Sequence, residues 1–91
     1  MFIVVSYDIV DDRRRRRVVK ILKGYGERVQ KSVFECLIGE PQFLKLKERV
    51  RGIIDSDEDN VRYYDLCRRC QGVIEFIGSP PKVDEEDYVI V

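Results

Sequence analysis

The chain has 91 residues, enough for one small domain and too few for two separate hydrophobic cores. Hydrophobic residues make up 44% and charged residues 37%, a globular composition, and no apolar run approaches the roughly 20 residues of a membrane-spanning helix. The net charge is zero, and the absence of histidine excludes catalytic triads, histidine-based acid–base catalysis and His-ligated metal sites.

The first half of the chain predicts a strand and then a helix. Residues 2–8 are mostly β-branched or aromatic and end at an aspartate, which is typical of a buried strand. Asp11 or Asp12 can cap the helix that follows, and the glycines at 24 and 26 end it. Its apolar positions recur at helical spacing: Val18, Ile21, Leu22 and Tyr25.

The rest of the chain predicts four more elements. Residues 28–38 fit one long strand, residues 41–54 a helix that begins near Pro41, and residues 61–67 and 73–77 two further strands. The acidic stretch 55–60 is a loop by composition, and residues 78–81 form a stiff linker before a short strand at 87–91. Taken literally the order is βαβαββ, although residues 28–38 could also bend into a hairpin.

These elements predict an α+β fold, a ferredoxin-like plait with a four-stranded sheet and two helices on one face. Both faces of strands 2–5 and 33–38 are largely apolar, so the second face also needs cover. A second copy related by a twofold axis would supply it. We therefore expect an obligate homodimer, with residues 1–78 as the domain and residues 79–91 as a linker and exchanged terminal strand.

Asp8 is a candidate metal-binding residue. A carboxylate that ends an apolar strand is costly unless it faces solvent, a partner or a cation. One carboxylate makes a poor Mg²⁺ site, but a twofold axis near Asp8 would bring two copies together. A metal there could polarise a phosphodiester and activate water without histidine. Alternatively, Asp8 simply caps the following turn.

Positive charge is concentrated in the first half, where 13 Lys and Arg face 7 Asp and Glu, against 4 and 10 in residues 52–91. The unbroken run Arg13–Arg17 lies on the first predicted helix, with Arg14 and Arg15 near its buried stripe. Arginine suits bidentate contact with phosphate, so the run favours a polyanionic partner whose backbone it would position. The alternative is a solvated helix face.

Three cysteines are an odd number and suit a reducing cytoplasm better than a disulfide scaffold. Cys67 and Cys70 form a lone C-x-x-C motif. With Cys36 as the only other cysteine, a closed zinc site within one chain would lack conventional ligands. A redox role would require a βαβ context with the motif opening a helix, which the pattern does not predict, so we expect buried free cysteines.

Two blocks of sequence resemble the CRISPR-associated Cas-two family, the small subunit of the spacer-acquisition complex. They are residues 5–18 (VSYDIVDDRRRRRV) and 24–36 (GYGERVQKSVFEC). The resemblance covers nearly the whole chain and implies a βαββαβ ferredoxin-like homodimer, with a C-terminal strand exchanged onto the partner's sheet. It also implies a cytoplasmic protein of antiviral defence with no membrane association.

The same resemblance implies functional residues. Asp8 matches the family's metal-binding acid at the dimer interface, with Mg²⁺ as cofactor. Five further positions match residues associated with nuclease activity or its architecture: Tyr7, Arg15, Arg17, Arg28 and Phe34. The family is described both as a Mg²⁺-dependent endonuclease on single-stranded RNA or duplex DNA and as a non-catalytic bridge that holds DNA between integrase dimers.

Two functions therefore stay open. The first is a phosphodiesterase that uses paired Asp8 carboxylates, with Arg15 and Arg17 holding phosphate. The second, which we favour as the biological role, is an adaptor that binds duplex DNA and the CRISPR integrase subunit. A regulatory domain that binds a small molecule would gain nothing from five consecutive arginines.

Overall fold

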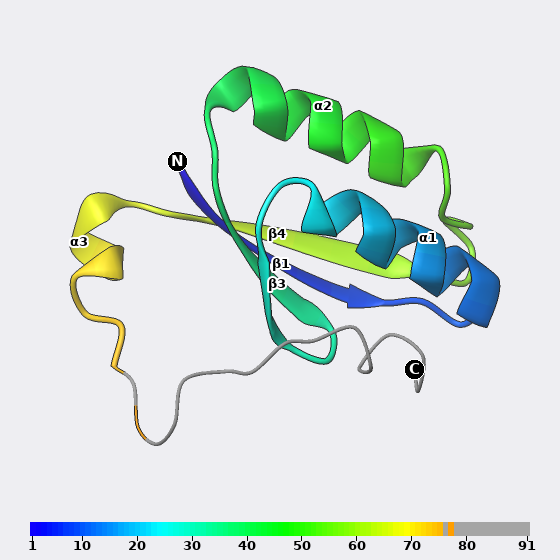
Figure 1. The fold of residues 1–91 in the computed structure, drawn as a ribbon, viewed down its shortest axis with the longest axis horizontal. Helices are drawn as coiled ribbons and strands as arrows, with labels where there is room; N and C mark the ends of the chain where they lie inside the picture. Colours follow the sequence, from blue (N-terminus) through cyan, green and yellow to red (C-terminus); the bar gives the residue numbers. More distant parts are fainter. Residues whose placement is uncertain (76, 78–91) are drawn as a thin grey trace.

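A computed structural model describes residues 1–75 and 77, which form a four-stranded sheet with helices packed on it (Figure 1). Its elements are β1 (Phe2–Asp8), α1 (Asp12–Lys23), β2 (Glu27–Gln30), β3 (Val33–Leu37), α2 (Glu40–Arg51), β4 (Asn60–Leu66) and α3 (Arg68–Gln71). The strand order is β2-β3-β1-β4, and all neighbouring strands are antiparallel. The expected α+β ferredoxin-like fold is confirmed.

The prediction of one long strand over residues 28–38 is wrong, because this segment is a hairpin. Strands β2 and β3 pair with each other and are joined at Lys31 and Ser32, with an irregular register between Arg28 and Gln30. Tight hairpin turns favour Asn-Gly or Asp-Gly, and neither dipeptide is present here to signal a turn. The hairpin makes the order of the main elements βαββαβ rather than the literal βαβαββ.

Local features of the sequence explain where the two long helices begin and end. Asp11 caps α1 by accepting a hydrogen bond from the backbone N–H of Arg14 at 2.9 Å. Helix α2 begins after Gly39, with Pro41 in its first turn, and ends at Gly52. Gly26 lets the chain leave α1 close to β3, because a Cβ there would lie only 2.2 Å from the carbonyl oxygen of Glu35.

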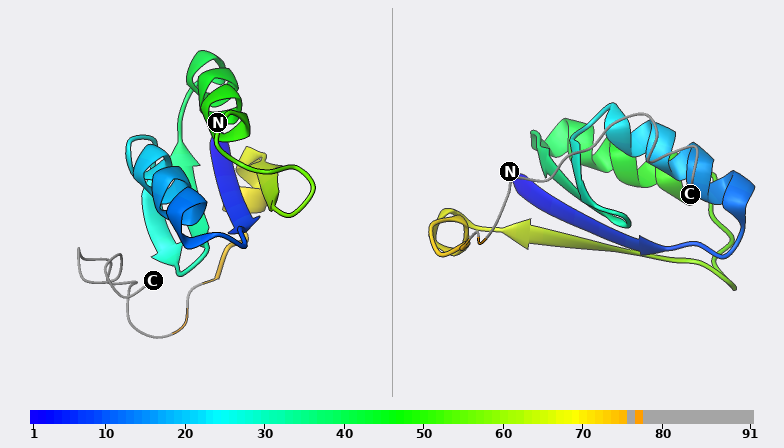
Figure 2. Two further views of the ribbon diagram at one scale, coloured as in Figure 1. Left: turned by 90° about the vertical axis from the view of Figure 1, so that its right-hand side faces the viewer. Right: turned by 60° about the horizontal axis from the view of Figure 1, so that its bottom comes forward.

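Both long helices cover the same face of the sheet (Figures 1 and 2). Side chains from β1, β3, α1 and α2 fill the space between the layers. The core consists of Ile3, Val5, Tyr7, Ile9, Val18, Val19, Leu22, Phe34, Cys36, Leu46 and Val50. The opposite, uncovered face carries the alternate residues of β1 and those paired with them, among them Phe2, Val4, Glu35, Leu37, Arg62, Tyr64 and Leu66.

The strand predicted at residues 73–77 is absent from the described residues 73–75 and 77. The chain instead forms the one-turn helix α3 directly after β4, capped by Cys67, and α3 lies beyond the end of the sheet (Figure 1). The expected linker at 78–81, the boundary between residues 78 and 79, and the strand at 87–91 lie outside the described residues. Among the helices of the described part, none is long and apolar enough to cross a membrane.

Candidate acidic site and nucleic-acid interface

Asp8 ends β1 on the uncovered face of the sheet, opposite Asn60 of β4. Strand alternation sends the neighbouring side chains of Tyr7 and Ile9 into the core, while the Asp8 side chain is exposed. Within residues 1–75 and 77 its carboxylate forms no hydrogen bond or ion pair. It is therefore available to a ligand, and a rigid strand fixes its position.

One chain does not by itself provide a complete set of metal ligands at Asp8. The described residues contain no group of three or more His, Cys, Asp or Glu side chains placed to hold a metal ion. Mg²⁺ in proteins commonly uses one or two carboxylates together with water and substrate phosphate. The exposed carboxylate of Asp8 fits that donor type, and a second copy of the chain would supply a second carboxylate.

The loop that follows Asp8 is held by the buried carboxylate of Asp59. Its oxygens accept hydrogen bonds from the backbone N–H groups of Val10 at 3.0 Å and Asp55 at 2.9 Å. The same carboxylate pairs with Arg14, whose Nε lies 2.9 Å and Nη2 3.2 Å away. The Asp59 side chain has no exposed surface, so this clamp joins the start of α1 to the loop before β4.

These contacts determine the ionisation of the clamp. The Arg14 guanidinium, followed by the two backbone N–H donors, lowers the pKa of Asp59 to about 2 against the opposing effect of burial. The Asp59 carboxylate in turn raises the pKa of Arg14. The ion pair therefore persists at neutral pH and holds Val10 beside the end of β1.

The burial of Asp59 is not apparent from the sequence. This residue lies in the acidic stretch 55–60, which composition marks as a solvated loop, and its neighbours Asp57 and Glu58 are indeed exposed. The one available signal is its place immediately before β4, where a loop joins the sheet. That signal does not show which acid turns inward.

Three of the predicted site residues lie together on the covered side of the sheet. The Tyr7 hydroxyl and the Arg28 Nε both donate to the backbone carbonyl of Lys31, at 3.0 and 3.1 Å. Phe34 is fully buried, and its ring centroid lies 6.4 Å from that of Tyr7. These three side chains therefore connect the β2–β3 turn to β1 on the face opposite Asp8. From there they can fix the position of β1 without touching a ligand bound by Asp8.

The arginine run divides between two roles. Arg14 and Arg15 are half-buried and face the loops: Arg15 Nη1 donates to the carbonyl of Ile9 at 2.9 Å, and its Nη2 pairs with Asp12. The other members are exposed and recur at helical spacing with the lysines that follow. This outer stripe of α1 comprises Arg13, Arg16, Arg17, Lys20 and Lys23.

The structure thus places Arg15 and Arg17 differently. Arg15 braces the residue directly after Asp8, whereas Arg17 belongs to the outer stripe. Helix α1 begins at the same end of the molecule at which β1 ends (Figure 1). This end therefore combines an exposed carboxylate with exposed guanidinium groups. The guanidinium groups can bind the phosphates of a nucleic acid, and the carboxylate can contribute one ligand to a metal ion.

Known proteins resemble this chain over most of its length. Residues 1–74 match the family described as CRISPR associated protein Cas2. "CRISPR-associated endoribonuclease Cas2 3" of Synechocystis is 44% identical over 88 residues, covering 97% of this chain and 96% of that protein. "CRISPR-associated endoribonuclease Cas2 1" of Chloroflexus aurantiacus is 42% identical and covers 99% of this chain and 100% of that protein.

Solved structures agree with this match. The crystal structure of Streptococcus pyogenes Cas2 superposes with a TM-score of 0.75 at 37% identity, covering 86% of this chain and 100% of that one. A hypothetical protein from Thermus thermophilus superposes with a TM-score of 0.78 at 41% identity, covering 89% and 94%. Sequence and fold lead to one conclusion: the chain belongs to the Cas2 family of CRISPR-associated proteins.

Proposed function

We propose that this chain binds duplex DNA as a homodimer that bridges integrase dimers during spacer acquisition. The observation that carries the proposal is the outer stripe of α1, in which Arg13, Arg16 and Arg17 are exposed. Guanidinium groups bind phosphate oxygens in bidentate fashion and position a nucleic acid without reading its bases. Family membership supports the integrase subunit as the protein partner.

The uncovered face of the sheet supports the homodimer. Leu37 and Tyr64 are 76% and 45% exposed, and strand pairing places them on the same face as Phe2, Val4 and Leu66. Contiguous apolar side chains of this kind mark interaction surfaces. A twofold contact through this face would also bring the two exposed Asp8 carboxylates toward one another.

The DNA-binding proposal is tested by reversing the charge of the outer stripe. We expect the triple variant Arg13→Glu, Arg16→Glu and Arg17→Glu to lose duplex DNA binding and integrase bridging. Any residual binding should depend less steeply on salt, by about one unit of slope per lost phosphate contact. The matched control is the reversal of three exposed basic residues on α2, Lys45, Arg49 and Arg51. Equal loss in both triple variants would contradict the assignment of α1.

A second candidate function is Mg²⁺-dependent cleavage of single-stranded RNA or duplex DNA. The exposed Asp8 carboxylate favours it, and several relatives carry the name endoribonuclease or endonuclease. Asp8 and its copy would hold Mg²⁺, which when bound supplies Lewis-acid activation of water and of the phosphodiester. Arg15 would keep the loop after Asp8 in place, and Arg17 would bind phosphate.

In this second function the remaining predicted residues position Asp8 rather than touch substrate. Tyr7, Arg28 and Phe34 fix β1 against the hairpin from the covered side. The test compares RNA and DNA cleavage by wild type, Asp8→Asn and the exposed-acid control Asp57→Asn, with and without Mg²⁺. We expect loss of cleavage in Asp8→Asn alone. Full activity in Asp8→Asn excludes the metal site, and intact DNA binding in that variant separates the two functions.

A further inference from the structure

Two cysteines lie side by side at the opposite end of β4 from Asn60. Cys67 follows β4 and caps α3, Cys70 lies within α3, and their Sγ atoms are 3.3 Å apart. Both side chains are exposed, while Cys36 is buried. All three cysteines are free, as expected, but the expected burial is right only for Cys36 and wrong for Cys67 and Cys70. The reason is that α1 and α2 do not extend over the end of the sheet where α3 lies (Figure 1).

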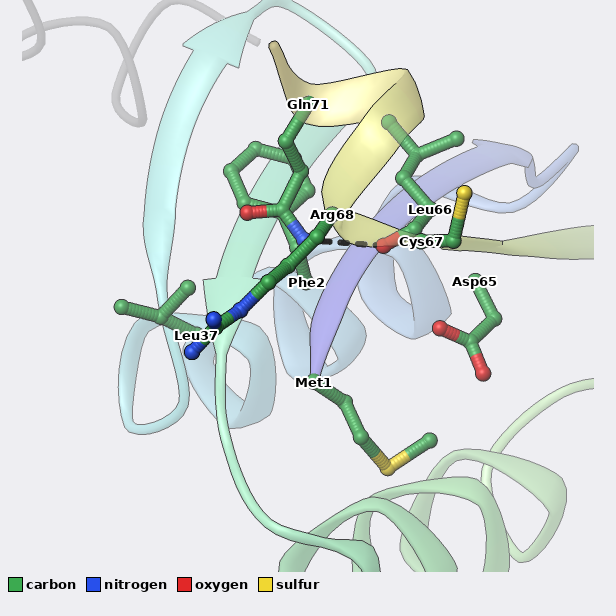
Figure 3. Close-up of a pocket in the computed structure, with 8 residues that line it drawn as sticks. All are labelled: Met1, Phe2, Leu37, Asp65, Leu66, Cys67, Arg68 and Gln71. Carbon is green, nitrogen blue, oxygen red and sulfur yellow. Dashed lines mark hydrogen bonds between the residues drawn. The ribbon is translucent and has the colours of Figure 1, made fainter.

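Local hydrogen bonds hold the two sulfurs in this arrangement. The backbone N–H of Cys70 donates to the Sγ of Cys67 at 3.4 Å. The side chain of Gln71 donates to the carbonyl of Leu66 at 2.9 Å, which fastens α3 to the end of β4 (Figure 3). A disulfide holds its sulfurs about 2.05 Å apart, so the two sulfurs, now 3.3 Å apart, must approach by little more than about 1 Å to bond.

We propose that Cys67 and Cys70 form a reversible dithiol–disulfide pair that exchanges with small disulfides such as glutathione disulfide. Deprotonated Cys67 attacks one sulfur of the incoming disulfide, whose S–S bond breaks and releases one thiolate. Cys70 then loses its proton and attacks the Sγ of Cys67, which releases the second thiolate. The protein dithiol is oxidised, the incoming disulfide is reduced to two thiols, and the two protein protons go to the released thiolates.

The contacts of the two thiols assign them different roles. The backbone N–H of Cys70, and then its thiol, lower the pKa of Cys67, whereas the adjacent Cys67 sulfur raises the pKa of Cys70. Cys67 is therefore the attacking sulfur and Cys70 the resolving one. The Cys67 side chain is exposed, so a small disulfide can reach its sulfur from solvent.

Cys36 provides an internal control. Burial raises its pKa to about 11 from an ordinary 9.0. Two pKa units correspond to a roughly 100-fold smaller thiolate fraction, before burial further restricts access. Cys36 should therefore stay reduced, and react only after the protein is unfolded, under conditions that oxidise the exposed pair.

The test follows the reduced, full-length chain in buffers of reduced and oxidised glutathione, with an acid quench, alkylation and mass spectrometry. Because Arg68 and Arg69 separate the two cysteines, trypsin places them on different peptides, 63–68 and 70–82. We expect these peptides to remain joined after oxidation and to separate after treatment with dithiothreitol. Cys36 should carry the alkyl label only in the unfolded protein.

Two single variants test the assigned roles. Cys70→Ser, which keeps the backbone N–H of residue 70 as a donor, should stop at one glutathione on Cys67, and Cys67→Ser should react more slowly at Cys70. Serine can still cap a helix, and circular dichroism checks that both variants fold. Wild-type protein that accumulates glutathione on both cysteines, or that joins two chains instead, would overturn the proposal. Equal reaction rates of the two variants would overturn it as well.

Discussion

The two faces of the sheet differ in what their apolar side chains do. On the covered face, residues such as Ile3, Val5 and Phe34 have no exposed surface and make the core. On the uncovered face, the large side chains of Leu37 and Tyr64 remain exposed. The same alternating strands thus supply the core on one side and exposed apolar side chains on the other. Substitutions on the two faces should therefore separate folding from association.

The largest effect on folding is expected from Phe34→Ala on the covered face. Removing a fully buried aromatic side chain leaves a cavity and costs about 3–5 kcal/mol of unfolding free energy. Chemical denaturation followed by circular dichroism measures the loss. Tyr64→Ala, an aromatic truncation on the uncovered face, is the matched comparison and should cost clearly less. Equal losses would remove the distinction between the faces.

A smaller, pH-dependent loss of stability is expected from Asp59→Asn. This substitution removes the carboxylate that joins the start of α1 to the loop before β4. Loss of the charged partner of Arg14 should cost about 1–3 kcal/mol at neutral pH. The folded pKa of Asp59, about 2, lies below its ordinary 3.8, so the carboxylate stabilises the fold above about pH 4. That contribution is lost as the pH falls through 2.

Denaturation of wild type and Asp59→Asn from pH 7 to pH 2 measures this prediction. The two proteins should differ most at neutral pH and converge in acid. A difference that stays constant over the whole range would show that Asp59 acts through shape rather than charge.

On the uncovered face, Leu37→Asp should leave folding nearly unchanged and weaken the proposed homodimer. An exposed substitution typically changes stability by less than about 0.5 kcal/mol. Burial of a leucine side chain at an interface contributes about 1.5–3 kcal/mol, and a twofold dimer loses two such side chains, so the dissociation constant should rise by at least roughly 100-fold. Analytical ultracentrifugation over a concentration series measures the dissociation constant of the homodimer. The control is Leu44→Asp on the exposed side of α2, and equal dissociation in both variants would contradict the proposed interface.

The smallest effect on folding is expected from Asp8→Ala. The carboxylate is exposed and has no partner within residues 1–75 and 77, so stability should change by less than about 0.5 kcal/mol. Thermal denaturation provides the measurement. A large loss would mean that Asp8 serves the fold, as Asp59 does, and would weaken its assignment as a metal ligand.

Much of the fold could be predicted from the sequence because hydrophobic periodicity reports burial. The strand at residues 2–8, the helix capped by Asp11 and the buried stripe with Val18 and Leu22 follow directly from it. The β2–β3 turn could not be predicted in this way, because Lys31 and Ser32 are not typical turn residues and the apolar pattern continues across them.

The candidate site was less predictable, since its residues depend on tertiary contacts. The sequence placed Asp8 at a strand end, but it did not show that Tyr7 and Arg28 share one carbonyl or that Asp59 is buried. It also did not show that C-x-x-C opens a helix, because α3 is a single turn without apolar periodicity. Short polar elements lack the repeated signal that longer amphipathic ones provide.

The carbonyl of Lys31 accepts hydrogen bonds from both Tyr7 and Arg28, while the lysine side chain itself is exposed. Both hydrogen bonds end on the main-chain carbonyl, which is present whatever amino acid occupies the position. Lys31 is thus a natural attachment point for a fluorophore or a cross-linker. A probe placed there would report on the rim of the sheet without loosening the network beneath it.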